Sequence, residues 1–240
     1  MSDMNYYRPS AFPPAIKNLI IINVLVFFAQ YIFGPSHPEI NNLFALHSIQ
    51  SVYFKPYQAI TYMFMHGSID HLLFNMLALW MFGSLLENSW GIGRFLFFYL
   101  ATGVGAAIAH LIVLYSEMAP VMEMIKRFPP EDQLKALYSD VFEVNGIQYT
   151  VNGITIGASG AVFGCLAAFG YLFPNSLIYL YFLIPIKAKW FVIIYGALEL
   201  WMGVKNSAGD NVAHFAHLGG AVVGLIIVIF WNKTRRRSLY

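Results

Sequence analysis

Six long apolar runs, separated by shorter polar stretches, dominate this chain of 240 residues. A helix needs about 20 mostly apolar residues to cross a bilayer, and each run approaches that length. The runs cover residues 16–33, 70–87, 94–115, 157–173, 189–204 and 212–231. A further apolar stretch, residues 176–186, is short and Tyr-rich and contains Pro185, so we interpret it as a re-entrant or interfacial connection before the fifth helix. The pattern predicts an all-α membrane protein with a bundle of six transmembrane helices.

The longest polar insertion, residues 117–156, separates the third and fourth runs. After a proline-led, acidic start, its apolar residues recur at helical spacing, which predicts a short helix. These residues are Leu134, Leu137, Tyr138, Val141 and Phe142. The following segment alternates around Asn145-Gly146, a dipeptide typical of a β-hairpin turn. We therefore expect a folded extramembrane cap here.

The composition is typical of a membrane protein and gives no reason to expect a cofactor. The chain is 58% hydrophobic and 11% charged, whereas soluble domains carry roughly 25% charged residues. A net charge of +2 gives no reason to expect a nucleic-acid partner. Cys165 is the single cysteine, so no intrachain disulfide is possible, and no zinc-type Cys/His spacing occurs. We expect neither a metal nor a cofactor.

The distribution of Lys and Arg indicates the orientation in the membrane. Six spans place both ends on one side, and the sequence KTRRR directly follows the last run. With both ends inside, nine of the 14 basic residues are cytoplasmic, which agrees with the positive-inside rule. We expect residues 1–15 and 232–240 to be cytoplasmic tails of a membrane domain formed by residues 16–231. The polar, proline-bearing start resembles neither a signal peptide nor an Arg-rich presequence, so we expect a bacterial plasma membrane.

Unusual polar residues occur at corresponding ends of the second, fourth and sixth runs. His71 and Asn75 are four residues apart, hence on one helix face, and Ser159 lies at the start of the predicted fourth helix. His214 and His217 begin the sixth. In the predicted topology all five lie at a similar depth near the outer surface. Polar side chains inside a membrane are costly and suggest function, although a single one can equally serve helix packing.

Two glycine stripes predict which of these residues meet. The stripes are Gly160 and Gly164 in the fourth run, and Gly220 and Gly224 in the sixth. Such small-residue spacing lets two helices approach closely. Ser159 borders the first stripe and His217 shares the face of the second, so the two side chains should meet. We expect His214, one turn nearer the outside, to be solvated or bonded to the adjoining loop.

This arrangement suggests nucleophilic catalysis. A serine hydroxyl needs a base to accept its proton, and an imidazole is the usual base. The oxyanion that forms needs N–H donors, which His71, Asn75 and the backbone amide of Ser159 can supply. A third triad member is not evident, because Asp70 points away from its neighbour's face and Asp210 lies in a loop. We therefore expect a catalytic dyad.

Three motifs, HGSIDHLLFN, GASGAVFG and AHLGGAVVG, occur in this order on the second, fourth and sixth runs. With them, the chain resembles the rhomboid family of intramembrane serine proteases over about residues 15–231. The resemblance implies a six-helix rhomboid-like bundle. It places the nucleophile at Ser159, the base at His217, oxyanion stabilisation at His71 and Asn75, and supporting roles at Gly157, Phe163 and His66. It also makes Glu87 a residue with a structural hydrogen bond.

The resemblance implies a serine-type endopeptidase that cleaves transmembrane segments of other membrane proteins. Its partners would be substrate helices and the lipid bilayer. A non-enzymatic transporter or client-binding protein is the alternative, with His71, His214 and His217 as proton-relay or metal-binding groups. The absence of internal repeats argues against a transporter.

Overall fold

The computed structural model describes residues 9–37, 39–139, 141–144, 146–180, 183–205 and 213–237. Its helices are α1 (Pro14–Phe33), α2 (Glu39–Phe44), α3 (Gln58–Thr61), α4 (Ile69–Ala78), α5 (Ser84–Trp90), α6 (Ile92–Ile125), α7 (Pro130–Tyr138), α8 (Ser159–Leu172), α9 (Ala188–Lys205) and α10 (His214–Arg237). The strands are β1 (Leu46–His47), β2 (Phe142–Val144), β3 (Ile147–Tyr149), β4 (Ile154–Thr155), β5 (Leu177–Leu180) and β6 (Ile184–Lys187).

Four helical segments of the described chain are long and apolar enough to cross a membrane, so the chain is that of an integral membrane protein. They are Pro14–Phe33, Ile69–Trp90, Ile92–Ile125 and His214–Thr234. The second joins α4 to α5 through a π-helical turn, Leu79–Gly83. The apolar helix α8 is too short to be counted with these four, and α9 carries three charged residues and is not apolar enough. The count of six spans remains a prediction.

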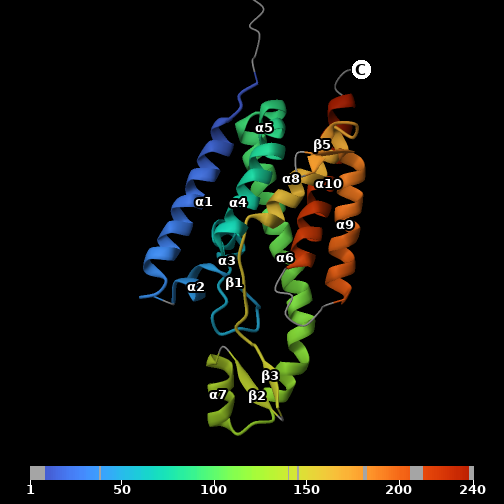
Figure 1. Cartoon of the computed structure of the whole chain (residues 1–240). Coiled ribbons are helices and arrows are strands. Elements are labelled where there is room, and N and C mark those ends of the chain that lie inside the picture. Colours follow the sequence, from blue (N-terminus) through green and yellow to red (C-terminus); the bar gives the residue numbers. More distant parts are fainter. Residues whose placement is uncertain are drawn as a thin grey trace, which may run out of the picture.

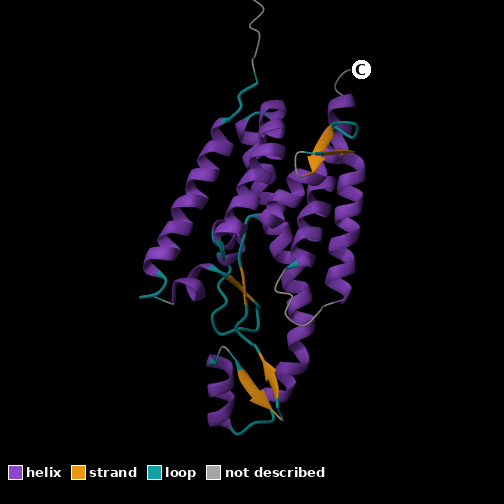
Figure 2. Ribbon diagram, viewed as in Figure 1, coloured by secondary structure: helices purple, strands orange, loops and turns teal. Residues whose placement is uncertain are grey.

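The molecule is mostly helical but not all-α, as Figure 2 shows. Among the described residues, three two-stranded antiparallel sheets occur, pairing β1 with β4, β2 with β3 and β5 with β6. The third of these sheets, the β5–β6 hairpin, covers nearly all of the connection predicted at residues 176–186 and ends one residue beyond it, with Leu177 opposite Lys187. Its Ile and Tyr residues favour extended backbone, which the hydropathy pattern alone does not reveal.

The insertion differs from the prediction at both of its helices. Helix α6 continues to Ile125, well beyond the expected end at residue 115, and α7 ends at Tyr138. Phe142 therefore leaves the helix and enters β2, where it lies opposite Tyr149. The hairpin prediction is confirmed, with Gly146 at a φ of 79°; Asn145 lies outside the described residues.

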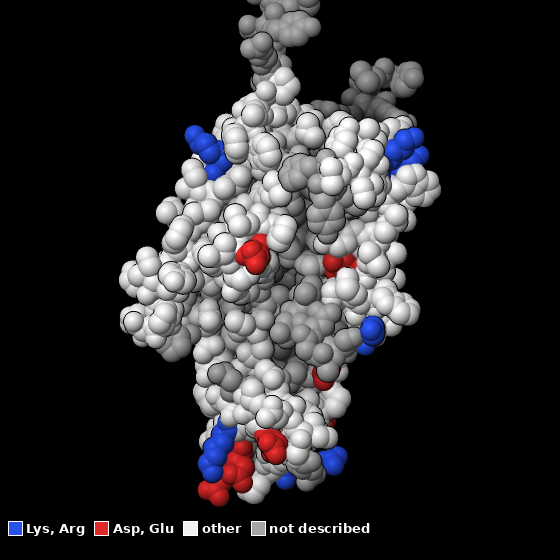
Figure 3. Space-filling view, viewed as in Figure 1, with Lys and Arg blue, Asp and Glu red and all other residues white. Residues whose placement is uncertain are grey.

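The extended end of α6, together with α7, β2 and β3, forms a small unit at one end of the molecule (Figure 1). Ile125, Ala136 and Val151 form its buried apolar cluster. On the face drawn in Figure 3, charged side chains gather around this end, and few lie on the broad middle of the molecule. Many large apolar side chains of the bundle helices are exposed. This separation of charged and apolar surface fits a unit outside the membrane attached to a bundle within it.

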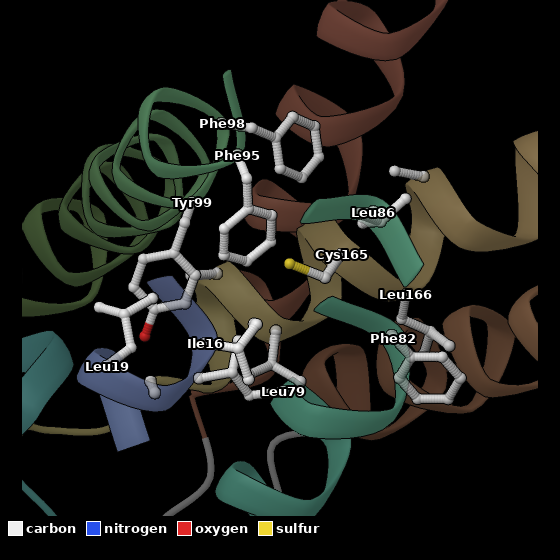
Figure 4. Close-up of a cluster of buried hydrophobic side chains, with 14 of the residues drawn as sticks. Ile16, Leu19, Leu79, Phe82, Leu86, Phe95, Phe98, Tyr99, Cys165 and Leu166 are labelled. Atoms are coloured by element: carbon white, nitrogen blue, oxygen red, sulfur yellow. The ribbon is translucent and has the colours of Figure 1, made fainter. Parts of the chain in front are cut away.

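Helix α8 is the centre of the bundle. Most of its side chains are buried, and it packs most extensively against α10 and α6. Figure 4 shows Cys165 of α8 among aromatic and aliphatic side chains of the neighbouring helices, including Phe95 and Phe98. A helix that is apolar on every side is stable in such a central position, which explains how α8 can be short.

The two predicted glycine stripes do pack together. A Cβ atom on Gly220 would overlap the carbonyl oxygen of Gly160, and one on Gly224 would lie 2.8 Å from that of Gly164. Neither position can therefore accept a larger residue without separating α10 from α8. This close backbone contact fixes the distance between the first turns of the two helices, where the polar residues lie.

Candidate active site

Ser159 and His217 meet at the ends of the two glycine stripes. Ser159 is the first residue of α8, and its Oγ lies 2.8 Å from Nε2 of His217 on α10. The imidazole stacks on the ring of Phe163, with centroids 4.3 Å apart and planes 4° from parallel. Phe163 therefore fixes the plane of the ring, and the hydrogen bond fixes which edge of the ring faces the hydroxyl.

His71 of α4 faces the same hydroxyl from across Gly157. Gly157 has a φ of 130°, where other residues are strained. A Cβ at this position would lie 2.8 Å from Nε2 of His71 and 3.6 Å from Oγ of Ser159. Glycine thus leaves a small space open between an imidazole nitrogen and the hydroxyl. The first N–H groups of α8, which have no acceptor within the helix, adjoin the same space.

Asn75 is buried one turn further along α4, and its side-chain nitrogen donates to the carbonyl oxygen of His71 at 2.9 Å. An amide nitrogen has two hydrogens, so one remains to serve another acceptor. The bond within the helix holds the amide against the ring-bearing residue. Asn75 thus combines a structural contact with an available donor.

His66 lies behind His71, with ring centroids 5.0 Å apart. Its backbone N–H donates to Oε1 of Gln30 at 3.0 Å, which anchors the loop before α4. Burial lowers the pKa of the His66 imidazole to about 4, and the nearby His71 ring adds to the shift. His66 is therefore neutral at physiological pH and supports the position of His71 by packing.

One cavity of about 970 Å³ connects most of these residues. The predicted site residues on its wall are His71, Asn75, Gly157, Ser159, Phe163 and His217. His66 does not line it. The wall also includes His110 of α6, whose Nε2 lies 2.8 Å from Oγ1 of Thr155 in β4, a pair that the sequence analysis did not identify.

The structure corrects two expectations about the histidines of α10. His214 is buried rather than solvated, and its Nδ1 lies 2.7 Å from Oε2 of Glu199; residues 206–212 of the adjoining loop lie outside the described residues, so the expected bond to that loop stays a prediction. The same oxygen of Glu199 lies 2.8 Å from Nδ1 of His217. A carboxylate therefore adjoins the serine–histidine pair, contrary to the dyad expectation. A lone glutamate within an apolar run was the available signal, since a membrane helix rarely carries an unpaired charge.

Glu199, His214 and His217 also form a group that could hold a metal ion, since one ligand atom from each lies within 4.8 Å of the others. Two imidazoles and a carboxylate are a common zinc donor set. The distances from the two imidazole nitrogens to the carboxylate oxygen decide between a metal ion and hydrogen bonds at this group.

Glu87, expected to have a structural hydrogen bond, has two. Its carboxylate oxygens accept the backbone N–H groups of Ala15 and Ile16 at the start of α1, both at 2.9 Å. Glu87 does not line the cavity. It joins α5 to α1 and takes no part in the arrangement around Ser159.

Together these features define a helical integral membrane protein with a serine–imidazole pair, backed by a carboxylate, on the wall of a cavity between its helices. The family model for the Rhomboid domain matches residues 53–233. The chain therefore belongs to the rhomboid family, as its three motifs suggested.

Similar proteins come from mitochondria and bacteria. The chain is 29% identical to RHOMBOID-like protein 12, mitochondrial, of Arabidopsis thaliana over 92% of its own length and 58% of that protein. It is 30% identical to Rhomboid protease GluP of Bacillus subtilis, over 70% of this chain and 24% of GluP. Against Rhomboid protease AarA of Providencia stuartii the identity is 27%, over 88% of this chain and 70% of AarA. Several of these relatives are thus considerably longer than the matched region.

Proposed function

We propose that the protein is an intramembrane serine endopeptidase that cleaves transmembrane segments of other membrane proteins. The observation that carries this proposal is the 2.8 Å contact between Oγ of Ser159 and Nε2 of His217 on the cavity wall. Two similar proteins are named as rhomboid proteases, which supports the same activity. Nucleophile, base and N–H donors together are the set that acyl transfer requires.

The proposed reaction begins when Ser159 Oγ attacks the scissile carbonyl carbon and gives its proton to Nε2 of His217. The π electrons of the carbonyl move to its oxygen, which enters the space beside Gly157. Donors from His71, Asn75 and the first turn of α8 stabilise that oxyanion. The C–N bond then breaks, the amine leaves with the proton from His217, and water hydrolyses the acyl-enzyme in a second, equivalent sequence.

The substrate in this proposal is an unwound stretch of a transmembrane segment. A helix hides its carbonyl groups in hydrogen bonds, so the scissile bond must leave the helix before attack. Small or helix-breaking residues near the bond favour that step. The largely apolar helices around the cavity suit such a segment, while the polar wall near Ser159 admits the water needed for hydrolysis.

The proposal includes both termini in the cytoplasm and the site near the outer surface, in a bacterial plasma membrane. The Lys and Arg distribution supports this orientation, and the bacterial relatives support the membrane. Cysteines introduced at residues 3 and 238 should react with a membrane-impermeant maleimide only from the cytoplasmic side. Labelling of either position from outside would contradict the orientation.

The decisive test is the Ser159→Ala variant in proteoliposomes. We expect cleavage of a model transmembrane substrate to fall about 10⁴–10⁶-fold, with loss of fluorophosphonate labelling. His217→Ala should lose both as well. Ser84→Ala is the matched control, because Ser84 is another serine of a bundle helix but does not line the cavity. Cleavage by Ser159→Ala at a rate near that of the unchanged protein would refute the proposal.

The same experiment separates the enzyme from the alternative class. A transporter or client-binding protein would not react covalently with a fluorophosphonate at Ser159. Binding of a substrate helix without cleavage or labelling, in protein that is folded, would favour that alternative.

A further inference from the structure

Glu199 is a buried carboxylate that the proposed reaction has not yet used. It lies on α9, is 3% exposed, and does not line the cavity. A single oxygen, Oε2, faces Nδ1 of His217 at 2.8 Å and Nδ1 of His214 at 2.7 Å. A buried carboxylate without partners is costly, so these two contacts account for its presence in an apolar helix.

We infer that Glu199 is a positioning residue of the Ser159–His217 pair, and that His214 is a second donor that holds its carboxylate in place. This inference rests on the proposed function. It makes the site a serine–histidine–glutamate triad, with the third member on α9.

Glu199 sets the tautomer of His217. A carboxylate oxygen only accepts hydrogen bonds, so Nδ1 of His217 must carry a hydrogen. In the neutral ring the lone pair is then on Nε2, the atom that lies 2.8 Å from Oγ of Ser159. This is the tautomer that can accept the serine proton. Without the carboxylate, the proton could instead occupy Nε2, and the ring could no longer act as a base.

Glu199 also stabilises the charge that His217 acquires during the reaction. When His217 accepts the serine proton, it becomes an imidazolium inside an apolar bundle. A carboxylate at 2.8 Å stabilises that cation strongly, because the surroundings screen charge poorly. Glu199 keeps its negative charge throughout and takes no proton. Its effect on the rate therefore comes through His217 and not through contact with the substrate.

His214 holds the carboxylate of Glu199 from a second direction. Its ring is nearly perpendicular to that of His217, at an interplanar angle of 89°. The two rings therefore approach the same carboxylate oxygen from different directions, one turn apart on α10. Two donors leave Oε2 less freedom to rotate away than one donor would. His214 thereby joins α9 to the start of α10.

The distances favour shared hydrogens over a metal at this cluster. Zinc binds nitrogen and oxygen ligands at about 2.0–2.1 Å in a tetrahedron, which sets those ligand atoms roughly 3.3 Å apart. The observed separations of 2.7 and 2.8 Å are shorter and lie in the range of charge-assisted hydrogen bonds. The cluster is built for two N–H donors and one acceptor.

Other titratable side chains lie near this cluster and could contribute to a pH profile. They include His71 of α4, His110 of α6 and Tyr195 of α9, each of which interacts electrostatically with His217 or Glu199. Only a change that follows substitution of Glu199 itself can therefore be assigned to this carboxylate.

The test compares Glu199→Gln, Glu199→Asp and the unchanged protein in proteoliposomes, with fluorophosphonate labelling and substrate cleavage measured from pH 5 to 9. For Glu199→Gln we expect kcat to fall about 10²–10⁴-fold with little change in KM. The acid limb of its rate profile should move to lower pH, because protonated His217 loses its anionic partner. Glu199→Asp keeps the charge and should recover part of the rate.

Glu87→Gln is the matched control, since Glu87 is an equally buried carboxylate bonded to backbone N–H groups away from the cavity. Its labelling rate per folded molecule and its pH profile should not change. Glu199→Gln protein that labels within about threefold of the unchanged rate, with an unmoved profile, would overturn the inference. Failure of the unchanged protein to label at Ser159 would instead refute the proposed function.

Two further measurements keep the inference testable if Glu199→Gln does not fold. The unchanged protein should show a strongly downfield imidazole N–H proton resonance that disappears in His217→Ala; its absence would count against the hydrogen bond. Metal analysis of the purified protein should find no stoichiometric zinc. Bound zinc, whose removal raises the labelling rate, would replace the triad with an inhibitory metal site.

Discussion

Glu87 and Glu199 are equally buried, each 3% exposed, yet they belong to different parts of the molecule. Glu87 accepts two backbone N–H groups at the start of α1, whereas Glu199 accepts from two imidazoles of α10. Both carboxylates join two helices. An amide hydrogen does not leave its nitrogen at physiological pH, but an imidazole gains and loses protons in that range. The two carboxylates therefore differ in their donors and not in their burial. Glu87 makes a scaffold contact, which only holds helices together, whereas Glu199 contacts a group that can take part in proton transfer.

The positions of the two glutamates agree with this difference. In Figure 1, the start of α1 lies near α5 at the end of the bundle where the described chain begins, and the first turns of α8 and α10 lie further into the molecule. Glu87 meets a helix N-terminus, where the backbone dipole favours a negative charge. The two backbone donors and the helix dipole are enough to stabilise the buried charge of Glu87. Four predictions, from the largest expected effect to the smallest, test whether the Glu87 contact and the site around Ser159 act independently of each other.

Gly160 and Gly164 of α8 pack against Gly220 and Gly224 of α10, and we call this contact the glycine seam. Substitutions in the seam should have the largest effect. Gly220→Leu places a side chain against the carbonyl oxygen of Gly160, so the helices must separate and His217 must leave Ser159. We expect little folded protein and no fluorophosphonate labelling, because overpacking against backbone has no flexible neighbour to yield. Size-exclusion chromatography and labelling measure both effects.

Gly196→Leu on α9 is the control for this substitution, since a Cβ there meets no atom within 4 Å. It should fold and label normally. Normal labelling by Gly220→Leu would mean that the seam does not set the distance between serine and base.

The Glu87 contact should affect stability alone. Glu87→Ala leaves the N–H groups of Ala15 and Ile16 without their acceptor, and a hydrogen bond to a charged group contributes about 1.5–3 kcal/mol. We expect the free energy of unfolding in detergent to fall by about 3 kcal/mol, which is measured as a lower thermal midpoint. The labelling rate per folded molecule should stay the same. A fall in that rate without a loss of stability would mean that the Glu87 contact influences the reactivity of Ser159.

The packing contacts between helices could be predicted from the sequence better than the polar partners of the site. The glycine spacing located the seam and the pairing of Ser159 with His217, because both follow from residues on single helix faces. Glu199 was missed because its contact depends on the rotation of α9 against α10, which no pattern within one helix encodes. The end of α7 and the β5–β6 hairpin were missed for a related reason, as apolar spacing alone does not separate helix from strand in short segments.

Asn75 combines features of both regions. Its side chain donates to a backbone carbonyl, as in a scaffold contact, but it also lines the cavity. As an oxyanion donor, its loss in Asn75→Ala should lower kcat about 10–10³-fold, with labelling reduced in parallel. If the variant instead loses thermal stability and keeps its normalised rate, Asn75 belongs with Glu87 as a structural residue. Gln58→Ala is a suitable comparison, since Gln58 is a buried amide that bonds the backbone outside the cavity.

The smallest expected effect concerns His214, which the inference treats as a support for Glu199 and not as the base. His214→Ala removes one of two donors to Oε2 and leaves the contact of Glu199 with His217 in place. We expect a fall in rate of about tenfold or less, corresponding to about 1.4 kcal/mol, with labelling of Ser159 retained.

His217→Ala, three residues further along the same helix, should abolish labelling. His217 alone of the two contacts Ser159 and stacks on Phe163, so the pair of variants separates base from support within one turn of α10. Loss of labelling in His214→Ala together with retention in His217→Ala would shift the register of α10 by one turn. It would assign the base to His214, whose Nδ1 contacts the same oxygen of Glu199, and would leave His217 as the support.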